Sequence, residues 1–409
     1  MISTDFAPNE TWSDAWVSIK LLFQPWRWKK GKEMSSIQKD LLSQFQITNN
    51  KLQITLFLSG RSALYNLLQS LKLPNNSEVL IQAFTCEAVV LPIIEANLKP
   101  IYVDIETQTF SMDSSQLVNK VTGNSKVLIL QHTFGLTPKY RKEILIFAKE
   151  HNLIVIEDLA HGFNPQLFSP PNSYLLTPNS YSLLSFGRSK ALSSVFGAAL
   201  ISSNRQLANK LTSHLAYPSY LFIFKCLLYK PLVMLIKSTY DIKIGLILHK
   251  LFKSINLLVL EISESEKGGK FDQLLNKRLP NGLTVLLENQ LKKFAIVQQN
   301  RSKITNLYHR HFQKTINYKL QTMNSPLLRY PLLVENRNLI LQKARRQNIF
   351  LGKWYDQVVA PKDLDLERVE YKLGSCPVAE GIGKKIINLP TNITLKKAEE
   401  IVNILNDVK

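Results

Sequence analysis

The sequence predicts an α/β protein in which a large domain, built on a mostly parallel sheet, precedes a smaller C-terminal α/β domain. Its 409 residues are too many for one small domain and suit a large domain with a second one. Between about residues 54 and 204, short apolar runs alternate with stretches of helically spaced apolar residues. A second strand–helix pattern begins near residue 275.

Repeated strand–helix–strand units define the large domain. Such repeats predict parallel strands with helices on both faces of the sheet. We expect strands at residues 54–58, 79–81, 101–104, 127–131, 153–157, 181–185 and 198–202. We expect helices at residues 61–71, 87–96, 114–121 and 140–150.

The C-terminal part follows a joint at residues 267–270, which reads Lys-Gly-Gly-Lys. It is expected to contain helices at 283–299, 337–347 and 395–408 and a strand at 330–334. We therefore divide the chain into an N-terminal arm (1–50), a large domain (51–266) and a small domain (267–409).

The charge is strongly positive, since 51 Lys and Arg face 31 Asp and Glu, for a formal net charge of +20. An anionic partner fits this balance: a phosphorylated substrate, an acidic membrane surface or nucleic acid. No nucleic-acid-binding module is recognisable, so we expect no nucleic-acid partner. The three cysteines show no CxxC spacing, which argues against a disulfide framework and against a structural metal site. A cytoplasmic location fits, because the first residues lack a signal-peptide pattern.

Two segments stand apart from the α/β pattern. In the arm, four tryptophans lie beside basic residues: Trp12, Trp16, Trp26 and Trp28 with Arg27, Lys29, Lys30 and Lys32. The insert, at about residues 215–262, is unusually apolar, and Lys243, Lys250 and Lys253 fall on one helical face. Both segments would suit packing on the protein body or on a partner subunit. Both would equally suit peripheral contact with a membrane at its inner face.

Polar residues follow several of the predicted strands, where open α/β sheets bind their ligands. The first group is the turn Ser59-Gly60-Arg61-Ser62, directly before a predicted helix. A helix N-terminus offers free N–H groups and the positive end of a dipole, which suits a phosphate. Ser59 as a simple N-cap explains the same turn.

Two further groups carry an acid and a lysine. Asp158 follows the strand 153–157, and a carboxylate there would keep a pyridinium nitrogen protonated. It would equally cap the next helix. Lys190 lies in a polar turn after Ser185, and a lysine amine in a partly desolvated pocket forms Schiff bases. His132, after the strand 127–131, would line the same pocket or satisfy a core position.

Taken together, these segments resemble the DegT/StrS family of fold-type-I pyridoxal phosphate (PLP) enzymes, the nucleotide-sugar aminotransferases. The resemblance covers about residues 50–205 and 275–405. It rests on the elements at 59–64, 132–135, 157–161 and 185–190, and on later ones at 278–281, 290–291, 351–355, 376–380 and 388–391. Each motif alone is weak evidence for the family, but so many motifs in the order of the family are strong evidence.

The resemblance implies a role for each matching residue. Lys190 would carry PLP as a Schiff base and move the proton during the reaction. Asp158 would pair with the pyridine nitrogen, and His161 would lie near the ring. The other cofactor-binding candidates are Gly60, Arg61, Ser62 and Ser185 for the phosphate, and Phe84 or Cys86 for the ring face. The substrate candidates are His132, Arg188 and Asn281.

Three departures from the family pattern bear on activity. Arg61 stands where family members often have threonine, and it would either strengthen phosphate binding or crowd the site. Phe196 precedes a single glycine where the family usually has two, so it would narrow the pocket. The apolar stretch 217–262 is long for the family. Lys190 itself argues against the related dehydratases, in which histidine replaces the lysine.

The resemblance also implies a fold, a reaction and partners. We expect a fold-type-I homodimer that transfers an amino group from an amino acid, by analogy glutamate, to an anionic keto-sugar for cell-surface polysaccharide or glycoconjugate synthesis. The sugar would be carried on a nucleotide or on a lipid. Two alternatives are a PLP enzyme acting on a non-sugar substrate and a degenerate, membrane-associated scaffold that keeps only the fold.

Overall fold

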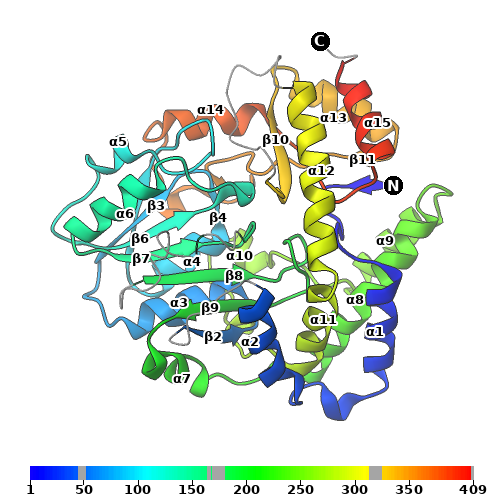
Figure 1. Ribbon diagram of the computed structural model, residues 1–409, viewed down its shortest axis with the longest axis horizontal. Helices are drawn as coiled ribbons and strands as arrows, with labels where there is room; N and C mark the ends of the chain where they lie inside the picture. Colours follow the sequence, from blue (N-terminus) through cyan, green and yellow to red (C-terminus); the bar gives the residue numbers. More distant parts are fainter. Residues whose placement is uncertain (45–51, 164–166, 168–179, 313–324, 407–409) are drawn as a thin grey trace.

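A seven-stranded sheet forms the centre of the molecule (Figure 1). This computed structural model describes residues 1–44, 52–163, 167, 180–312 and 325–406. The strand order is β2–β9–β8–β7–β6–β3–β5, and only β9 runs antiparallel to its neighbours. The strands are β2 (Gln53–Phe57), β3 (Glu78–Gln82), β5 (Lys99–Val103), β6 (Ser125–Gln131), β7 (Ile154–Asp158), β8 (Ser180–Ser185) and β9 (Ala198–Ser202). The predicted α/β class with a mostly parallel sheet is confirmed.

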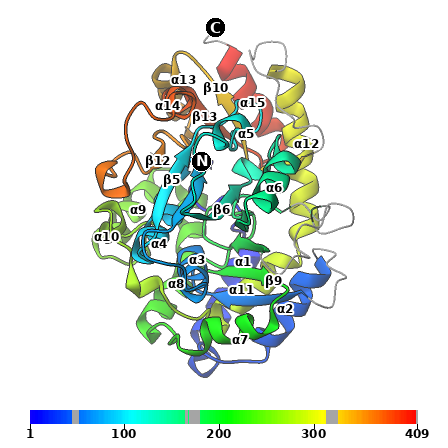
Figure 2. The same cartoon turned by 90° about the vertical axis from the view of Figure 1, so that its left-hand side faces the viewer.

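Helices cover both faces of this sheet, because the alternating side chains of its strands are apolar on both sides. Val79 and Ile81 of β3 join one buried cluster, whereas Leu80 between them joins another. Figure 2 shows α6 on one side of the sheet and α4 on the other. The helices are α3 (Gly60–Ser70), α4 (Glu87–Glu95), α5 (Ser114–Leu117), α6 (Arg141–Glu150) and α7 (Arg205–Ser213). The helix expected at 114–121 is thus a single turn.

The C-terminal part packs around an antiparallel strand pair, β10 (Arg329–Leu333) with β13 (Ile386–Pro390). Its helices are α12 (Phe294–Phe312), α13 (Arg337–Arg346), α14 (Pro377–Lys385) and α15 (Leu395–Asn406). The single helix expected at 283–299 was wrong, since the chain forms α11 (Asn281–Leu291) and then α12. The two pack in different places, α11 against helices of the arm and α12 against α15. The division near residue 267 stays a prediction.

The N-terminal arm reaches both parts of the molecule. β1 (Ile2–Ser3) pairs with β11 (Ile349–Phe350), and α2 (Glu33–Gln44) packs against α11. Between them, α1 (Trp12–Leu22) and the turn η1 (Pro25–Arg27) lie along the insert. The arm therefore joins segments that are far apart in the sequence.

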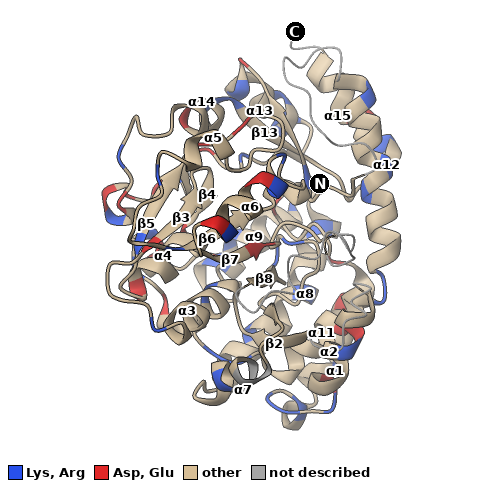
Figure 3. Cartoon of the chain, turned by 60° about the vertical axis from the view of Figure 1, so that its left-hand side comes forward, with Lys and Arg blue, Asp and Glu red and all other residues tan. Residues whose placement is uncertain are grey.

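The insert is a helical pair, α8 (Tyr220–Thr239) and α9 (Ile244–Ser254). α8 packs against α1, α9 and α11, and the right-hand side of Figure 1 shows it beside α1. No helix of the described residues is long and apolar enough to cross a bilayer. Basic residues are spread over the chain rather than gathered on one element (Figure 3).

Candidate active site

A pocket of about 470 Å³ opens where the strands of the large sheet end. Its walls come from the β2–α3 turn, the ends of β7 and β8, the loop after Lys190, and residues 353–363 of the C-terminal part. Seven of the predicted site residues line it: Gly60, Arg61, Cys86, Asp158, His161, Ser185 and Lys190. Parallel strands end at one edge of a sheet, so the fold brings these separate motifs together.

Lys190 is the nucleophile candidate of the pocket. Burial lowers the pKa of its amine, although Cys86, Glu261 and Asp158 partly oppose that shift. Its Nζ lies 5.0 Å from the centre of the Trp354 ring. Because only a neutral amine attacks a carbonyl, a lowered pKa favours Schiff-base chemistry at this position.

Asp158 is the buried carboxylate of the same pocket, with 5% of its surface exposed. It accepts a hydrogen bond from the N–H of Ala160 (2.9 Å), and it forms no ion pair with any residue of the described chain. Burial raises its pKa, with Ala160 and Lys190 opposing. A buried carboxylate without a cation is costly, so this arrangement fits a ligand that brings a positive charge.

His161 lies behind Asp158 and is held on both ring nitrogens. Its Nδ1 accepts a hydrogen bond from the N–H of Phe134 (3.1 Å), so its Nε2 carries the proton and donates to Tyr355 (2.9 Å). Burial, with the nearby Lys190 and Arg329, holds the pKa of His161 well below its usual value. The ring is therefore neutral and fixed in orientation.

The turn between β2 and α3, together with Ser185, is the candidate cradle for an anion. Gly60 and Arg61 begin α3, and their N–H groups have no helical carbonyl to bind. A Cβ at Gly60 would lie 3.9 Å from Ser185 Oγ, so the hydroxyl faces the same point. Ser62 does not line the pocket: its N–H binds Ser59 Oγ, and its own Oγ donates to Asn276.

Arg61 does not offer a free guanidinium to this turn. It forms ion pairs with Glu87 (2.7 Å) and Glu266, and only 12% of its side chain is exposed. Burial opposes its charge, but the two carboxylates outweigh burial and raise its pKa. Its charge is thus already balanced within the chain.

Glu261 is an acid that sequence reasoning missed, and it lies in the same cradle. Its Oε1 accepts a hydrogen bond from Ser189 Oγ (2.5 Å). A Cβ at Gly187 would lie 3.8 Å from both Glu261 Oε1 and Ser185 Oγ, so the carboxylate and the hydroxyl lie on the same side of this turn. Burial opposes its ionisation, but Arg188, Ser189 and Lys190 hold its pKa below the usual value. Arg188 itself does not line the pocket and donates to the carbonyl of Val259 (2.6 Å).

The two alternatives for the ring face separate in the structure. Cys86 lines the pocket, and burial raises its thiol pKa to about 12. Phe84 is fully buried behind it, edge-on to Tyr355 with 5.4 Å between ring centres. Cys86 is therefore the residue of this loop that a ligand would meet.

Two substrate candidates lie away from the pocket. His132 binds Glu157 (2.9 Å), which also pairs with Arg141 (2.6 Å). Successive residues of a strand point to opposite faces, so Glu157 and its partners lie on the far side from Asp158. Asn281 is buried under the arm, where it donates to the carbonyl of Arg27 (2.9 Å).

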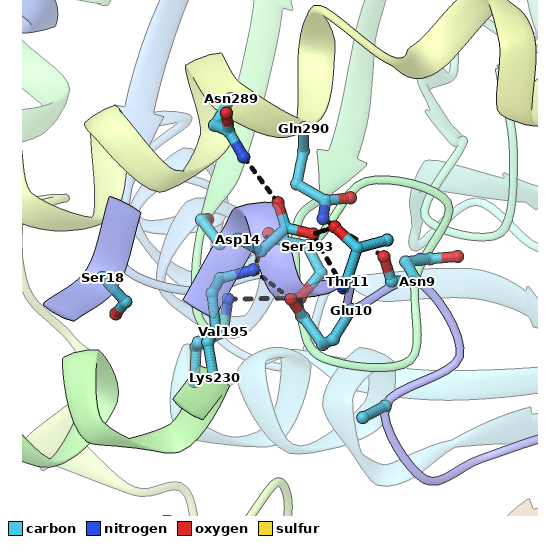
Figure 4. Close-up of polar contacts among 12 residues, drawn as sticks. Asn9, Glu10, Thr11, Asp14, Ser18, Ser193, Val195, Lys230, Asn289 and Gln290 are labelled. Carbon is cyan, nitrogen blue, oxygen red and sulfur yellow. Dashed lines mark hydrogen bonds and ion pairs between the residues drawn. The ribbon is translucent and has the colours of Figure 1, made fainter. Parts of the chain in front are cut away.

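The loop after Lys190 forms part of the pocket wall. Val195 and Phe196 both line it, and Val195 has a φ of 75°, which is strained for a β-branched residue. Figure 4 shows Ser193 and Val195 of this loop beside Glu10 and Lys230. The arm and the insert therefore hold the loop that shapes the pocket.

Three further residues of the pocket were not among the predicted site residues. Trp354 and Tyr355 come from the C-terminal part, and Asp5 comes from the arm. Arg329, at the start of β10, lies over the Trp354 ring at 3.2 Å and pairs with Asp5. Trp354 and Tyr355 fall in the element 351–355 of the family resemblance, although no role was assigned to them there. Asp5 and Arg329 belong to no motif of the sequence, so only the tertiary structure identifies them.

This sheet topology, with a strand-end lysine facing a buried carboxylate beside a helix N-terminus, defines the class of PLP-dependent transferases. The chain belongs to the DegT/DnrJ/EryC1/StrS aminotransferase family, whose profile matches residues 23–218 and 260–409. The residues present fit the cofactor: Asp158 forms no ion pair among the described residues, the N-terminus of α3 lies by Ser185, and Lys190 lines the same pocket. The profile leaves out all of α1, α8 and α9.

Known proteins are similar over most of the chain or over part of it. An uncharacterized protein of Methanocaldococcus jannaschii is 23% identical over 90% of this chain and 86% of its own length. The GDP-perosamine synthase of Escherichia coli O157:H7 is 25% identical over 50% of this chain and 54% of its own length. The structure of NtdA from Bacillus subtilis, with bound cofactor PMP, shares 17% identity at a TM-score of 0.68 and covers 97% of this chain and 81% of that one.

Proposed function

We propose that this PLP-dependent aminotransferase takes an amino group from an amino acid, glutamate by analogy, and transfers it to a nucleotide-linked keto-sugar. The observation that carries the proposal is that Lys190 and Asp158 line one pocket and that the charge of Asp158 raises the pKa of Lys190. The similarity to a GDP-perosamine synthase supports a sugar acceptor. The net charge of +20 supports an anionic one.

In this proposal each residue of the pocket has its own role toward the cofactor or the substrate. Bound PLP supplies an electron sink that stabilises negative charge at the substrate carbon. Lys190 binds the cofactor covalently and moves the proton at that carbon, and Asp158 holds the ring nitrogen protonated. The N–H groups of Gly60 and Arg61, with Ser185, hold the phosphate. His161 and Cys86 confine the ring, and Phe196 limits the space for the sugar.

The visible spectrum of the purified protein with added PLP tests this proposal. We expect a yellow absorption band in the wild type that is absent from Lys190→Ala and is bleached by glutamate. A keto-sugar nucleotide should restore the band. A folded wild type with no band would refute the enzyme proposal and favour the scaffold alternative. Restoration by simple keto acids alone would favour a non-sugar substrate.

The oligomeric state is also a proposal. We propose a homodimer, by analogy with the family resemblance, in which the second subunit completes the active site. Light scattering coupled to size exclusion measures the mass directly. A monomeric holoenzyme with full activity would contradict this proposal.

We further propose that the protein works in the cytoplasm and rests on the inner, anionic membrane surface through α1, α8 and α9. These helices pack side by side and expose large apolar side chains. Trp16 and Trp26 are 61% and 73% exposed, and Ile247 of α9 is 64% exposed. The exposed lysines near them are Lys20, Lys30, Lys243, Lys250 and Lys253.

Charge complementarity favours lipid as the occupant of this face. Apart from Asp241, which pairs with the N-terminal amine, residues 217–260 contain no acid. Tryptophan with lysine is typical of the headgroup region of anionic bilayers. The proposal therefore commits to a lipid surface rather than to a second subunit on this face.

Flotation with vesicles tests this contact. The wild type should float with vesicles containing phosphatidylglycerol but not with phosphatidylcholine alone. Replacing Lys243, Lys250 and Lys253 by Glu should abolish flotation. The same replacement at the exposed Lys142, Lys149 and Lys396 should not. Equal loss of flotation in both triple variants would mean that only the net charge of the protein matters. A change from dimer to monomer in the variant at Lys243, Lys250 and Lys253 would assign this face to a subunit contact.

A further inference from the structure

Arg329 is a buried arginine with unused hydrogen-bonding capacity. Only 1% of its surface is exposed, and its charge pairs with Asp5 alone among the described residues. Its Nε and Nη2 have no hydrogen-bond partner in the described part of the chain. A guanidinium has five N–H donors, and buried polar groups are normally satisfied. The unmet donors therefore indicate a ligand.

Arg329 and the reacting lysine both lie against the ring of Trp354. Trp354 lines the pocket, and its ring has Arg329 Cζ at 3.2 Å and Lys190 Nζ at 5.0 Å. Burial lowers the pKa of Lys190, and Arg329 contributes to the same shift, so the two cations interact. An amino acid whose nitrogen reacts at Lys190 would therefore bring its carboxylates close to Arg329.

Asp5 shows what kind of group fits there. It lines the pocket, and its side chain remains 47% exposed although it pairs with Arg329. The arm thus places a carboxylate, open to the pocket, on an otherwise unsatisfied guanidinium. The planar fork of arginine matches a carboxylate with two parallel hydrogen bonds.

We infer that Arg329 binds a carboxylate of the amino donor, and that Asp5 holds this place in the substrate-free protein. The inference rests on the proposed aminotransfer and names the residue that selects its donor. Donor binding would displace Asp5 from Arg329 and occupy Nε and Nη2. The arm would then compete with the donor for one guanidinium.

The two half-reactions of the holoenzyme test this inference separately. In Arg329→Lys, which keeps the charge but loses the fork, we expect the half-saturating concentration of glutamate to rise about 10- to 100-fold. The half-reaction with the keto-sugar nucleotide should change little. In the matched control Arg141→Lys, whose arginine pairs with Glu157 outside the pocket, both half-reactions should stay as in the wild type.

A binding measurement without turnover gives an independent readout. Glutarate, which has two carboxylates and no amine, should bind the holoenzyme and quench Trp354 fluorescence. Arg329→Lys should weaken this binding, and Asp5→Asn should tighten it because the competing carboxylate is gone. Glutamine and 4-aminobutyrate, which lack the γ- and the α-carboxylate respectively, show which carboxylate Arg329 binds: the analogue lacking that group should be insensitive to Arg329→Lys.

Several outcomes would overturn the inference. Unchanged glutamate and glutarate binding in Arg329→Lys would do so, and so would equal losses in both half-reactions. A loss confined to the sugar half-reaction would assign Arg329 to the acceptor. If Arg329→Lys does not fold, the Asp5→Asn variant tests the inference instead. Unaltered glutarate affinity in that variant would show that Asp5 does not compete for Arg329. A wild type without a PLP band would instead refute the proposed function itself.

Discussion

Glu10 of the arm and Lys230 of α8 form an ion pair in which both side chains are fully buried, although 220 residues separate them (Figure 4). Lys230 also donates to the carbonyl of Ser193 (3.0 Å), and Ser193 Oγ donates to Glu10 (2.7 Å). The pair therefore holds the loop between Lys190 and Phe196. Through it, the arm and the insert determine one wall of the pocket.

Replacing Lys230 by Met should destabilise the protein strongly. Glu10 would keep its charge in the interior with only Ser193 as a partner, which typically costs about 3–5 kcal/mol. Urea unfolding measures this loss. Adding Glu10→Gln to the variant should recover part of it, because no buried charge then remains.

Lys250→Met is the control for this experiment. Lys250 lies exposed on α9, so its loss should change the free energy of unfolding by less than about 0.5 kcal/mol. If Lys230→Met is as mild as Lys250→Met, the buried pair does not exist in solution.

Glu157 should make the protein sensitive to acid. Burial opposes its charge, but His132 and Arg141 outweigh burial and lower its pKa from 4.5 to about 2. Because the folded-state pKa lies below the unfolded one, this stabilisation is complete above about pH 4.5 and is lost as the pH falls towards about 2.

Glu157→Gln should therefore lower the free energy of unfolding at neutral pH by about 3 kcal/mol. It should also flatten the dependence of stability on pH in that acid window. Thermal melts at a series of pH values measure both effects. An unaltered acid profile in the variant would contradict the assigned cause.

Capture of PLP by the cofactor-free protein should depend on pH in a specific direction. The neutral amine of Lys190 is the reactive form, and burial lowers its pKa from the ordinary 10.5. The capture rate should rise with pH, with a midpoint below that value. Asp158→Asn should shift the midpoint further down, because Asp158 raises the pKa of Lys190. A midpoint at the value of free lysine would show that the amine is solvated.

Glu261→Gln should tighten PLP binding. Glu261 is ionised beside Ser185, where the cofactor phosphate would lie, so the two anions repel. Removing one of two like charges that lie close together near the protein surface is worth about 1 kcal/mol, or about fivefold in the Kd of PLP. Titration of PLP absorbance measures it, and more salt should reduce the difference. Glu264→Gln, at the exposed start of the neighbouring helix, should leave Kd unchanged.

The sheet could be predicted because its strands are local patterns. β2, β6, β7, β8 and β9 all begin and end within two residues of their expected positions, since each is an apolar run bounded by polar turns. β13 escaped prediction because its apolar run, Ile-Ile-Asn-Leu-Pro, is interrupted by Asn388 and ends in a proline, which is not typical of a strand. The break between α11 and α12 escaped it because both halves are helical, and only their different packing partners separate them.

The candidate site divides in the same way. Asp158 and Ser185 are the last residues of β7 and β8, and Lys190 lies in the turn after β8, so the ends of neighbouring parallel strands brought them to one edge. His132 also follows a strand, yet its partner Glu157 draws it to the opposite face. The position of a residue at a strand end predicts that it lies near the pocket edge of the sheet. It does not predict the direction of the side chain, which depends on the partner that the side chain contacts.

The sequence by itself determined the class of fold, the family and the strand-end residues of the pocket, because these depend on periodicity and on motifs within a few residues. The tertiary structure alone decided the rest. It brought Asp5 and Arg329 together across the chain, buried Glu10 with Lys230, and placed Glu261 in the anion cradle. Contacts of this kind form between residues hundreds of positions apart, and their energies depend on burial and orientation, which no local pattern of the sequence records.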